Sequence, residues 1–199
     1  MPAPVIYYIR HGETSWNAAG RLQGAQDTAL NDLGRKQAVQ SGHILADLLA
    51  RDGRDKSQLP YVASPLSRAR TTMELMRGAL ELPPARYATD DRLREIGYGK
   101  WEGFTLAEME AADPLFFARR LADKWRVAPE GGETYEAVQQ RMAEWYADVK
   151  TDTVVVAHGG TARALMVALG SETPESAADL PIAQGAVYAF SDGSLKKYS

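Results

Sequence analysis

Short apolar runs alternate with longer amphipathic segments along this chain. The short runs contain mainly β-branched and aromatic residues without an interposed polar position, a pattern typical of buried strands. The clearest of them are 5–9, 61–63 and 153–157. The longer segments carry apolar residues at helical spacing. Strands that alternate with helices predict a mostly parallel sheet with helices on both faces.

Start and stop signals define the first two helices. Asn31 is a candidate N-cap, and Asp52-Gly53 is a stop signal for a helix with one apolar stripe. That stripe is formed by Ala38, Gly42, Leu45 and Leu49. Ser64-Pro65 predicts an N-cap followed by proline in the first turn of the next helix, which would end at Pro83-Pro84.

The second half of the chain continues this alternation. Residues 105–125 predict two helical pieces divided by Pro114, with an aromatic cluster of Phe116, Phe117 and Trp125. We expect further helices over 133–149 and from the segment after 157 to Gly170, a favourable residue just past a helix end. Asp192-Gly193 between two short apolar runs predicts a hairpin and hence an antiparallel edge to the sheet.

This order of elements predicts a three-layer α/β/α fold with a mostly parallel central sheet. No repeat, low-complexity tract or long linker interrupts the 199 residues, a length that suits one domain. We therefore expect a single domain over 1–199, with a helical, lid-like excursion at about 104–132. The aromatic residues of the excursion fit equally well a local core and a wall that selects the substrate.

Composition narrows the classes of protein. The chain has no cysteine, which excludes disulfides, thiolate metal sites and a cysteine nucleophile and is compatible with a reducing compartment. A net charge of −3 argues against nucleic-acid binding, which needs a basic face. No signal peptide or membrane span is visible, so we expect a cytoplasmic protein that acts on a small molecule; a homodimer stays open.

The polar residues that follow the strands are the candidates for chemistry, because ligands bind beyond the carboxyl ends of parallel strands. Two of the three histidines, His11 and His158, occupy such positions, and each precedes a glycine. We expect both to be exposed at the mouth of the sheet. Arg10 beside His11 and Arg68 in a first helical turn are suitable cations for a phosphate, although each could instead pair with a neighbouring acid. His43 has the pattern of an ordinary surface residue.

Several motifs, in order, resemble one family. They are Arg10-His11-Gly12-Glu13-Thr14, Trp16-Asn17, Gly20-Arg21-Leu22-Gln23-Gly24, Ser64-Pro65-Leu66-Ser67-Arg68-Ala69, Leu93-Arg94-Glu95, Trp101-Glu102-Gly103 and His158-Gly159-Gly160. Over essentially the whole chain, this set resembles the histidine phosphatase superfamily, which includes the cofactor-dependent phosphoglycerate mutases. The resemblance implies a phosphoglycerate mutase-like fold and an enzyme without a metal or other cofactor.

The resemblance also implies a role for each matching residue. His11 would be the nucleophile that becomes phosphohistidine, and Glu95 would donate a proton to the leaving alkoxide. The residues implied to hold the phosphoryl group or line the substrate side are Arg10, Asn17, Gln23, Gly24, Arg68, His158 and Gly159. Glu13, close to His11 in sequence, is the competing carboxylate for the acid role.

Within the family, the sequence favours a phosphatase over a mutase. The chain is short for a mutase. Two of its segments resemble the phosphatase branch, namely Ile96-Gly97-Tyr98-Gly99-Lys100-Trp101-Glu102-Gly103 and Pro129-Glu130-Gly131-Gly132-Glu133-Thr134. We expect a phosphomonoesterase that hydrolyses a small phosphorylated metabolite, with ribazole phosphatase and broad-specificity phosphatase both open. The alternatives are a cofactor-dependent phosphoglycerate mutase, a non-catalytic phospholigand-binding module, and a metal enzyme that uses the two histidines, which the nearby arginines disfavour.

Overall fold

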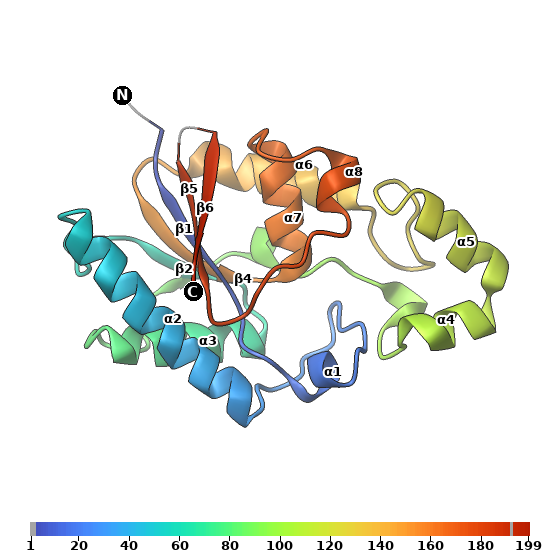
Figure 1. Ribbon diagram of the computed structural model, residues 1–199, viewed down its shortest axis with the longest axis horizontal. Coiled ribbons are helices and arrows are strands. Elements are labelled where there is room, and N and C mark those ends of the chain that lie inside the picture. The colour runs from blue at the N-terminus through green and yellow to red at the C-terminus, as the bar shows by residue number, and fades with distance from the viewer. Residues whose placement is uncertain (1–2, 192) are drawn as a thin grey trace.

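A central sheet organises the molecule, which we describe from a computed structural model (Figure 1). The structure describes residues 3–191 and 193–199. Within them the sheet has the strand order β3-β2-β4-β1-β5-β6. The strands are β1 (Ile6–Arg10), β2 (Tyr61–Ala63), β3 (Ala88–Thr89), β4 (Thr153–Ala157), β5 (Val187–Ser191) and β6 (Ser194–Tyr198).

Most of the helices cover the two faces of this sheet, and two of them form an excursion that stands apart from it. The helices are α1 (Ser15–Ala18), α2 (Asp32–Arg51), α3 (Ser67–Ala79), α4 (Leu106–Ala112), α5 (Pro114–Ala122), α6 (Tyr135–Asp148), α7 (Gly159–Ala168) and α8 (Pro174–Ala177), with short 3-10 turns at Asp91–Leu93 and Gly99–Trp101. The predicted three-layer α/β/α fold with a mostly parallel sheet is confirmed. Strands β1 to β4 are parallel where they pair, whereas β5 runs antiparallel to both β1 and β6.

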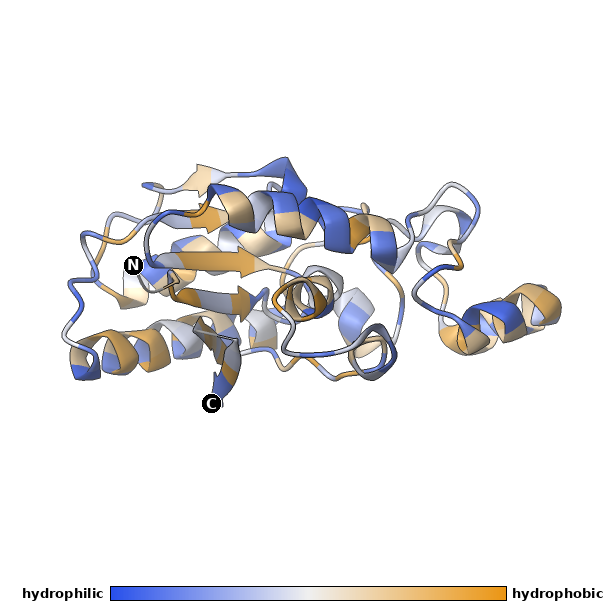
Figure 2. Ribbon diagram, turned by 90° about the horizontal axis from the view of Figure 1, so that it is seen from above, coloured by the Kyte–Doolittle hydropathy of each residue, from blue (hydrophilic) through white to orange (hydrophobic). Residues whose placement is uncertain are grey.

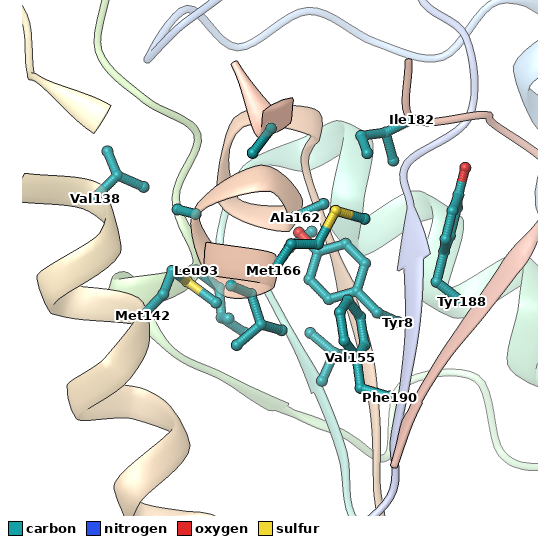
Figure 3. Packing of buried hydrophobic residues seen from close by; sticks show 14 of the residues in the cluster. Tyr8, Leu93, Val138, Met142, Val155, Ala162, Met166, Ile182, Tyr188 and Phe190 are labelled. Atoms are coloured by element: carbon teal, nitrogen blue, oxygen red, sulfur yellow. The ribbon is translucent and has the colours of Figure 1, made fainter. Parts of the chain in front are cut away.

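Alternate residues of β1 and β4 belong to two separate cores. Tyr8 and Val155 face the cluster formed with α6 and α7, part of which is drawn in Figure 3. Tyr7 and Val154 face the cluster formed with α2 and α3. Because side chains alternate across a strand, a strand that is covered on both sides is apolar throughout. Figure 2 shows the apolar strands between helices of mixed hydropathy.

Several predicted boundaries are confirmed. The side chain of Asn31 accepts a hydrogen bond from the amide of Gly34 at the start of α2, and Gly170, with φ of +73°, follows the end of α7. Helices α4 and α5 meet at Pro114, as predicted. Strands β5 and β6 form the predicted hairpin, although Asp192 of the predicted turn lies outside the described residues.

Two local predictions are wrong. Helix α3 begins at Ser67 and not at Ser64-Pro65, and it ends at Ala79, before Pro83. The aromatic residues 116, 117 and 125 do not form one cluster: Phe116 stacks on the Trp101 ring, whereas Trp125 stacks on the Tyr135 ring at the start of α6. Each of these two aromatic residues is thus placed by a ring from outside 105–125.

The excursion extends from one end of the molecule. Helices α4 and α5 stand apart from the sheet and its covering helices in both views (Figures 1 and 2). The side chains of Leu115 and Leu121 on α5 are 81% and 60% exposed. No helix in the described ranges 3–191 and 193–199 has the length and apolar character that a membrane span requires.

Candidate active site

The strand register brings the segments that follow β1 and β4 together at the carboxyl ends of the strands. Arg10 is paired with Ala157 at the ends of β1 and β4, so His11 and His158 leave the sheet at the same level. Their ring centroids lie 5.1 Å apart. The amide of His11 donates to the carbonyl of Ala157 at 2.9 Å, which continues the ladder by one residue.

Both imidazoles are buried, contrary to the predicted exposure: His11 is 1% and His158 is 0% exposed. For His11, the prediction failed because the glycine that follows it allows the backbone of α2 to pack closely on this loop. A Cβ on Gly12 would lie 2.1 Å from the carbonyl oxygen of Gly34. Burial, followed by the nearby arginine charges, holds the pKa of both histidines well below the usual range.

The tautomer of His11 follows from the one hydrogen bond that its ring makes within the described residues. Its Nδ1 lies 2.8 Å from the carbonyl oxygen of Gly12. Because a carbonyl can only accept, Nδ1 carries the proton of the neutral ring. The lone pair is then on Nε2, which makes no hydrogen bond within the described part of the chain. A neutral imidazole in this state can act as a nucleophile.

The Ser64 hydroxyl holds the other histidine. It lies 2.7 Å from Nε2 of His158, while Nδ1 of His158 is buried without a hydrogen-bond partner in the described structure. Ser64 follows β2 at the same sheet edge, since its amide donates to the carbonyl of Val156. This contact replaces the predicted helix cap and was not evident from the local sequence.

Two arginines approach the histidines without an acidic partner. Arg10 donates to the carbonyl of Ile182, and the fully buried Arg68 donates to the carbonyls of Gly24 and Gln26. Neither forms an ion pair with a described residue. The pairing with neighbouring acids that the sequence left open is therefore absent here. The Nε atoms of both are buried and have no hydrogen-bond partner in the part of the chain that the structure describes.

Glu95 enters the site from the loop that follows the first 3-10 turn. Its carboxylate accepts hydrogen bonds from the amides of Ile96 and Gly160, each at 2.9 Å. A Cβ on Gly160 would lie 2.3 Å from the Glu95 Oε1, so only glycine permits this approach. Glu13 instead accepts a hydrogen bond from the Asn31 side chain and is not among the residues that line the cleft.

A cleft of about 190 Å³ opens above these groups. It brings together seven of the predicted residues and four that the prediction missed. The predicted ones are Arg10, His11, Asn17, Gln23, Gly24, Glu95 and Gly159, and the missed ones are Arg21, Leu22, Tyr98 and Arg163. Arg68 and His158 are fully buried beside the lining residues. For Arg163, the available signal was its position four residues after Gly159, on the same face of α7.

The side chains give little support to the alternative of a metal enzyme. No group of three or more histidine, aspartate or glutamate side chains is arranged to hold an ion among residues 3–191 and 193–199. The cations around His11 and His158 are arginines, which a divalent ion would repel.

Comparison with known proteins agrees with this geometry. Residues 6–193 match the family model described as the histidine phosphatase superfamily (branch 1). The chain belongs to the histidine phosphatase superfamily. It is 38% identical over 178 residues to a glucosyl-3-phosphoglycerate phosphatase of Mycolicibacterium vanbaalenii, covering 82% of this chain and 73% of the relative. It is 32% identical over 172 residues to phosphoserine phosphatase 1 of Hydrogenobacter thermophilus, covering 82% and 75%.

Solved structures of this superfamily have the same architecture. A mycobacterial glucosyl-3-phosphoglycerate phosphatase, determined as a complex with VO3, aligns with a TM-score of 0.78 and 29% identity over 98% of this chain and 95% of that one. The predicted phosphoglycerate mutase-like fold is thus confirmed. Together with the phosphatase relatives, the family assigns this histidine phosphatase to the phosphoric monoester hydrolases.

Proposed function

We propose that this histidine phosphatase hydrolyses a small phosphorylated metabolite through a phosphohistidine at His11. The proposal rests on one observation: the nucleophile lies beside hydrogen-bond donors that have no partner in the described residues. His11 presents a free Nε2, and Arg10, Arg68 and His158 each have a buried ring or guanidinium nitrogen without a partner in the described residues. Buried donors are rarely left unpaired, so a ligand with several acceptor oxygens fits this place.

A phosphoryl group has the charge and the shape that these donors require. Phosphoryl transfer depends on positioning and on neutralising the equatorial oxygens, which fixed guanidinium groups achieve without a metal. We assign Arg10, Arg68 and His158 to these oxygens, with Asn17 and the Gly159 amide beside them. Gln23 and Gly24 line the substrate side.

The reaction proceeds in two balanced steps. Nε2 of His11 forms a bond to phosphorus, and the phosphorus–oxygen ester bond breaks as the Glu95 carboxylic acid gives its proton to the leaving oxygen. In the second step, water attacks phosphorus and gives a proton to the Glu95 carboxylate, and the phosphorus–nitrogen bond breaks. Inorganic phosphate and the alcohol are the products, and His11 and Glu95 return to their starting states.

Trapping the intermediate tests this function. Rapid acid-free quenching after mixing with a phosphomonoester labelled at phosphorus should leave label on the protein, at His11 in peptide mapping. His11→Asn should abolish both the label and the steady-state release of phosphate. Phosphate release with no label at any mixing time, or unchanged activity of His11→Asn, would refute the mechanism. Ligand binding without turnover would instead favour the phospholigand-binding module.

Glu95→Gln tests the proton donor. An alkoxide needs an acid to leave, whereas a p-nitrophenolate hardly does. We therefore expect the substitution to lower kcat/KM, which covers the steps up to cleavage of the ester bond, by roughly 10²- to 10⁴-fold for alkyl phosphates, the usual contribution of general acid catalysis. It should lower kcat/KM for p-nitrophenyl phosphate much less. Glu13→Gln is the matched control and should leave the ratio of the two rates unchanged. Equal losses on both substrates would remove Glu95 from this role.

A panel of phosphomonoesters defines the substrate. It should include glucosyl-3-phosphoglycerate and phosphoserine, after the names of the two relatives, and 3-phosphoglycerate with and without 2,3-bisphosphoglycerate. Phosphate release should exceed isomerisation on every compound; the reverse would make this enzyme a mutase. Full activity in excess chelator is expected, and its loss would restore the metal alternative.

The wider parts of the proposal rest on the sequence. We propose that residues 1–199 act as one histidine phosphatase domain with α4 and α5 as its lid-like excursion. The net charge of −3 supports a small-molecule substrate over nucleic acid, and the absence of cysteine is compatible with a cytoplasmic location. Sedimentation of the purified chain would decide between monomer and homodimer.

A further inference from the structure

Arg163 lies beside the proposed phosphoryl site, but the proposed function gives it no role. Arg163 projects from α7 one turn after Gly159, so both residues share one face of that helix. A Cβ on Gly159 would lie 3.5 Å from Nε of Arg10 and 3.8 Å from Nη1 of Arg163. The missing side chain of Gly159 therefore leaves the two guanidinium groups facing the same space in the cleft.

Hydrogen bonds to uncharged groups hold the guanidinium of Arg163 in place and leave its charge uncompensated among the described residues. Its Nε donates to the carbonyl of Leu180 at 2.9 Å, and its Nη1 donates to the Tyr135 hydroxyl at 3.1 Å. Its Nη2 has no hydrogen-bond partner in the described residues, and Arg163 is absent from the ion pairs among them. Two neutral anchors hold the group in place, and one terminal nitrogen is left for a ligand.

The other cleft arginine outside the phosphoryl site differs in this respect. The guanidinium of Arg21 forms an ion pair with Glu108 at 2.8 Å and also donates to the carbonyl of Gly103 at 2.6 Å. Its charge is already compensated by the start of α4. Arg163 is therefore the lining cation that an additional anionic group would meet.

Counting charges indicates what that group is. A phosphomonoester dianion is balanced by Arg10 and Arg68. Glu95 must be protonated to act as the acid of the proposed function, and it is the one carboxylate among the described residues that line the cleft. One positive charge, on Arg163, then has no counter-charge among these lining residues. A single carboxylate has the matching charge and accepts hydrogen bonds from a guanidinium with favourable geometry.

We infer that Arg163 binds a carboxylate on the alcohol portion of the substrate, so that the preferred substrates are phosphate esters of hydroxy acids. This inference rests on the proposed function. It makes Arg163 a specificity residue that contacts substrate, while the chemistry stays with His11 and Glu95. If Arg163 only connected α7 to Tyr135 and Leu180, its loss would reduce activity on all substrates alike.

Two substrate pairs separate these outcomes because their members differ at the carboxylate. O-phosphoserine is compared with O-phosphoethanolamine, and 3-phosphoglycerate with glycerol 3-phosphate. The quantity measured is kcat/KM for the acid divided by kcat/KM for its partner. The wild-type ratio should exceed one in both pairs, and Arg163→Met should lower it by roughly tenfold or more, as expected for a charged hydrogen bond. With p-nitrophenyl phosphate, Arg163→Met should lose less than about threefold.

Two further variants complete the design. Arg86→Met removes a positive charge from an exposed loop and should leave both ratios unchanged. Tyr135→Phe removes one anchor of Arg163 while keeping its charge, and should lower the ratios by less than Arg163→Met does. If Arg163→Met does not fold, as judged by circular dichroism and thermal unfolding, the ratios of Tyr135→Phe decide.

The inference and the proposed function can fail separately. Wild-type ratios of one or less, or equal losses on both members of a pair, would overturn the role of Arg163 while phosphate release and the His11 label persist. Absence of phosphate release from every ester, including p-nitrophenyl phosphate, would overturn the proposed function itself.

Discussion

The immediate surroundings of His11 favour its neutral form. Burial is the largest cause of its lowered pKa, and the charges of Arg10 and Arg68 act in the same direction. The Gly12 carbonyl opposes them but fixes the proton on Nδ1. A histidine that must attack phosphorus benefits from burial and from the two arginine charges, because only the neutral ring has a lone pair on Nε2. The Gly12 carbonyl contributes by directing that lone pair to Nε2.

Ser64 shows what local sequence could not predict. A serine before a proline is a common way to begin a helix, and the sequence predicted a cap here. In the structure its hydroxyl contacts Nε2 of His158, a residue 94 positions away. The residue type was informative, since it pointed to a hydrogen-bonding serine, but its partner depends on the pairing of β2 with β4.

Ser64→Ala should disturb the tautomer of His158. When the hydroxyl donates to Nε2, the ring proton is on Nδ1, where it can bond to the phosphoryl group; without the hydroxyl that preference is lost. We expect kcat/KM to fall by roughly three- to tenfold, the range that one hydrogen bond usually contributes. The ¹⁵N chemical shifts of the ring should show a changed tautomer, which a general packing defect would not cause.

Ser64→Thr is the matched control for this prediction because it keeps the hydroxyl. It should recover most of the activity and the original ring tautomer. Recovery of activity without recovery of the ¹⁵N shifts would mean that Ser64 acts through packing alone.

The elements fall into two groups by how well their patterns predicted them. The buried strand β4, a continuous apolar run, and the long helix α2, with its apolar stripe, were predicted within about one residue. The start of α3 was missed because Leu66 caps it without a side-chain hydrogen bond. Patterns report which face of an element is buried, whereas its ends depend on contacts from other parts of the fold.

The excursion is attached to the body through a small number of side chains. Phe116 of α5 stacks on the buried Trp101 with the centroids 5.9 Å apart, and Arg120 lies over the ring of Tyr98, which lines the cleft. Arg21 connects the cleft to α4 through Glu108. Contacts so few predict that α4 and α5 open at a lower free energy than the sheet does.

Phe116→Ala should loosen the excursion without unfolding the molecule. The substitution removes an aromatic pair worth about 0.5–1.5 kcal/mol beyond its buried area. We expect limited proteolysis within 104–132 to become roughly 2- to 10-fold faster while the main thermal transition shifts little. Mass spectrometry of the first fragments locates the cleavage.

Leu115→Ala gives the comparison on the same helix, since Leu115 is 81% exposed and contributes little packing. It should be cleaved at the wild-type rate. If Phe116→Ala is cleaved no faster than Leu115→Ala, the stacking on Trp101 does not hold the excursion in place.

The order and register of the strands bring the residues of the site together. His11, Ser64 and His158 come from three strands that the register aligns at one edge of the sheet. Their convergence could be predicted, because parallel strands present their carboxyl ends together and ligands bind there. Their burial could not, because it depends on how α2 packs on Gly12. Arg163 was missed for a related reason: its place in the cleft depends on anchors at Tyr135 and Leu180, from two other segments.

Burying two histidines beside two arginines also affects the stability of the molecule. In the unfolded chain each imidazole gains a proton as the pH falls through about 6.5, whereas the native rings, whose pKa values are lowered, stay neutral. The unfolded state then binds more protons than the native state, so the free energy of unfolding must decrease with decreasing pH. This stability is fully present above pH 6.5 and is lost below it, until the native pKa values are reached.

Urea unfolding between pH 7.5 and 5 measures this loss. Two histidines that protonate only on unfolding give a limiting slope of about 2.7 kcal/mol per pH unit. His11→Gln should reduce the slope by about half, since one of the two imidazoles is gone. Inorganic phosphate should bind the arginines of the native state and so raise the free energy of unfolding, increasingly as it occupies the site. A free energy of unfolding that does not change from pH 7.5 to 5 would mean that the buried rings accept protons in the native state.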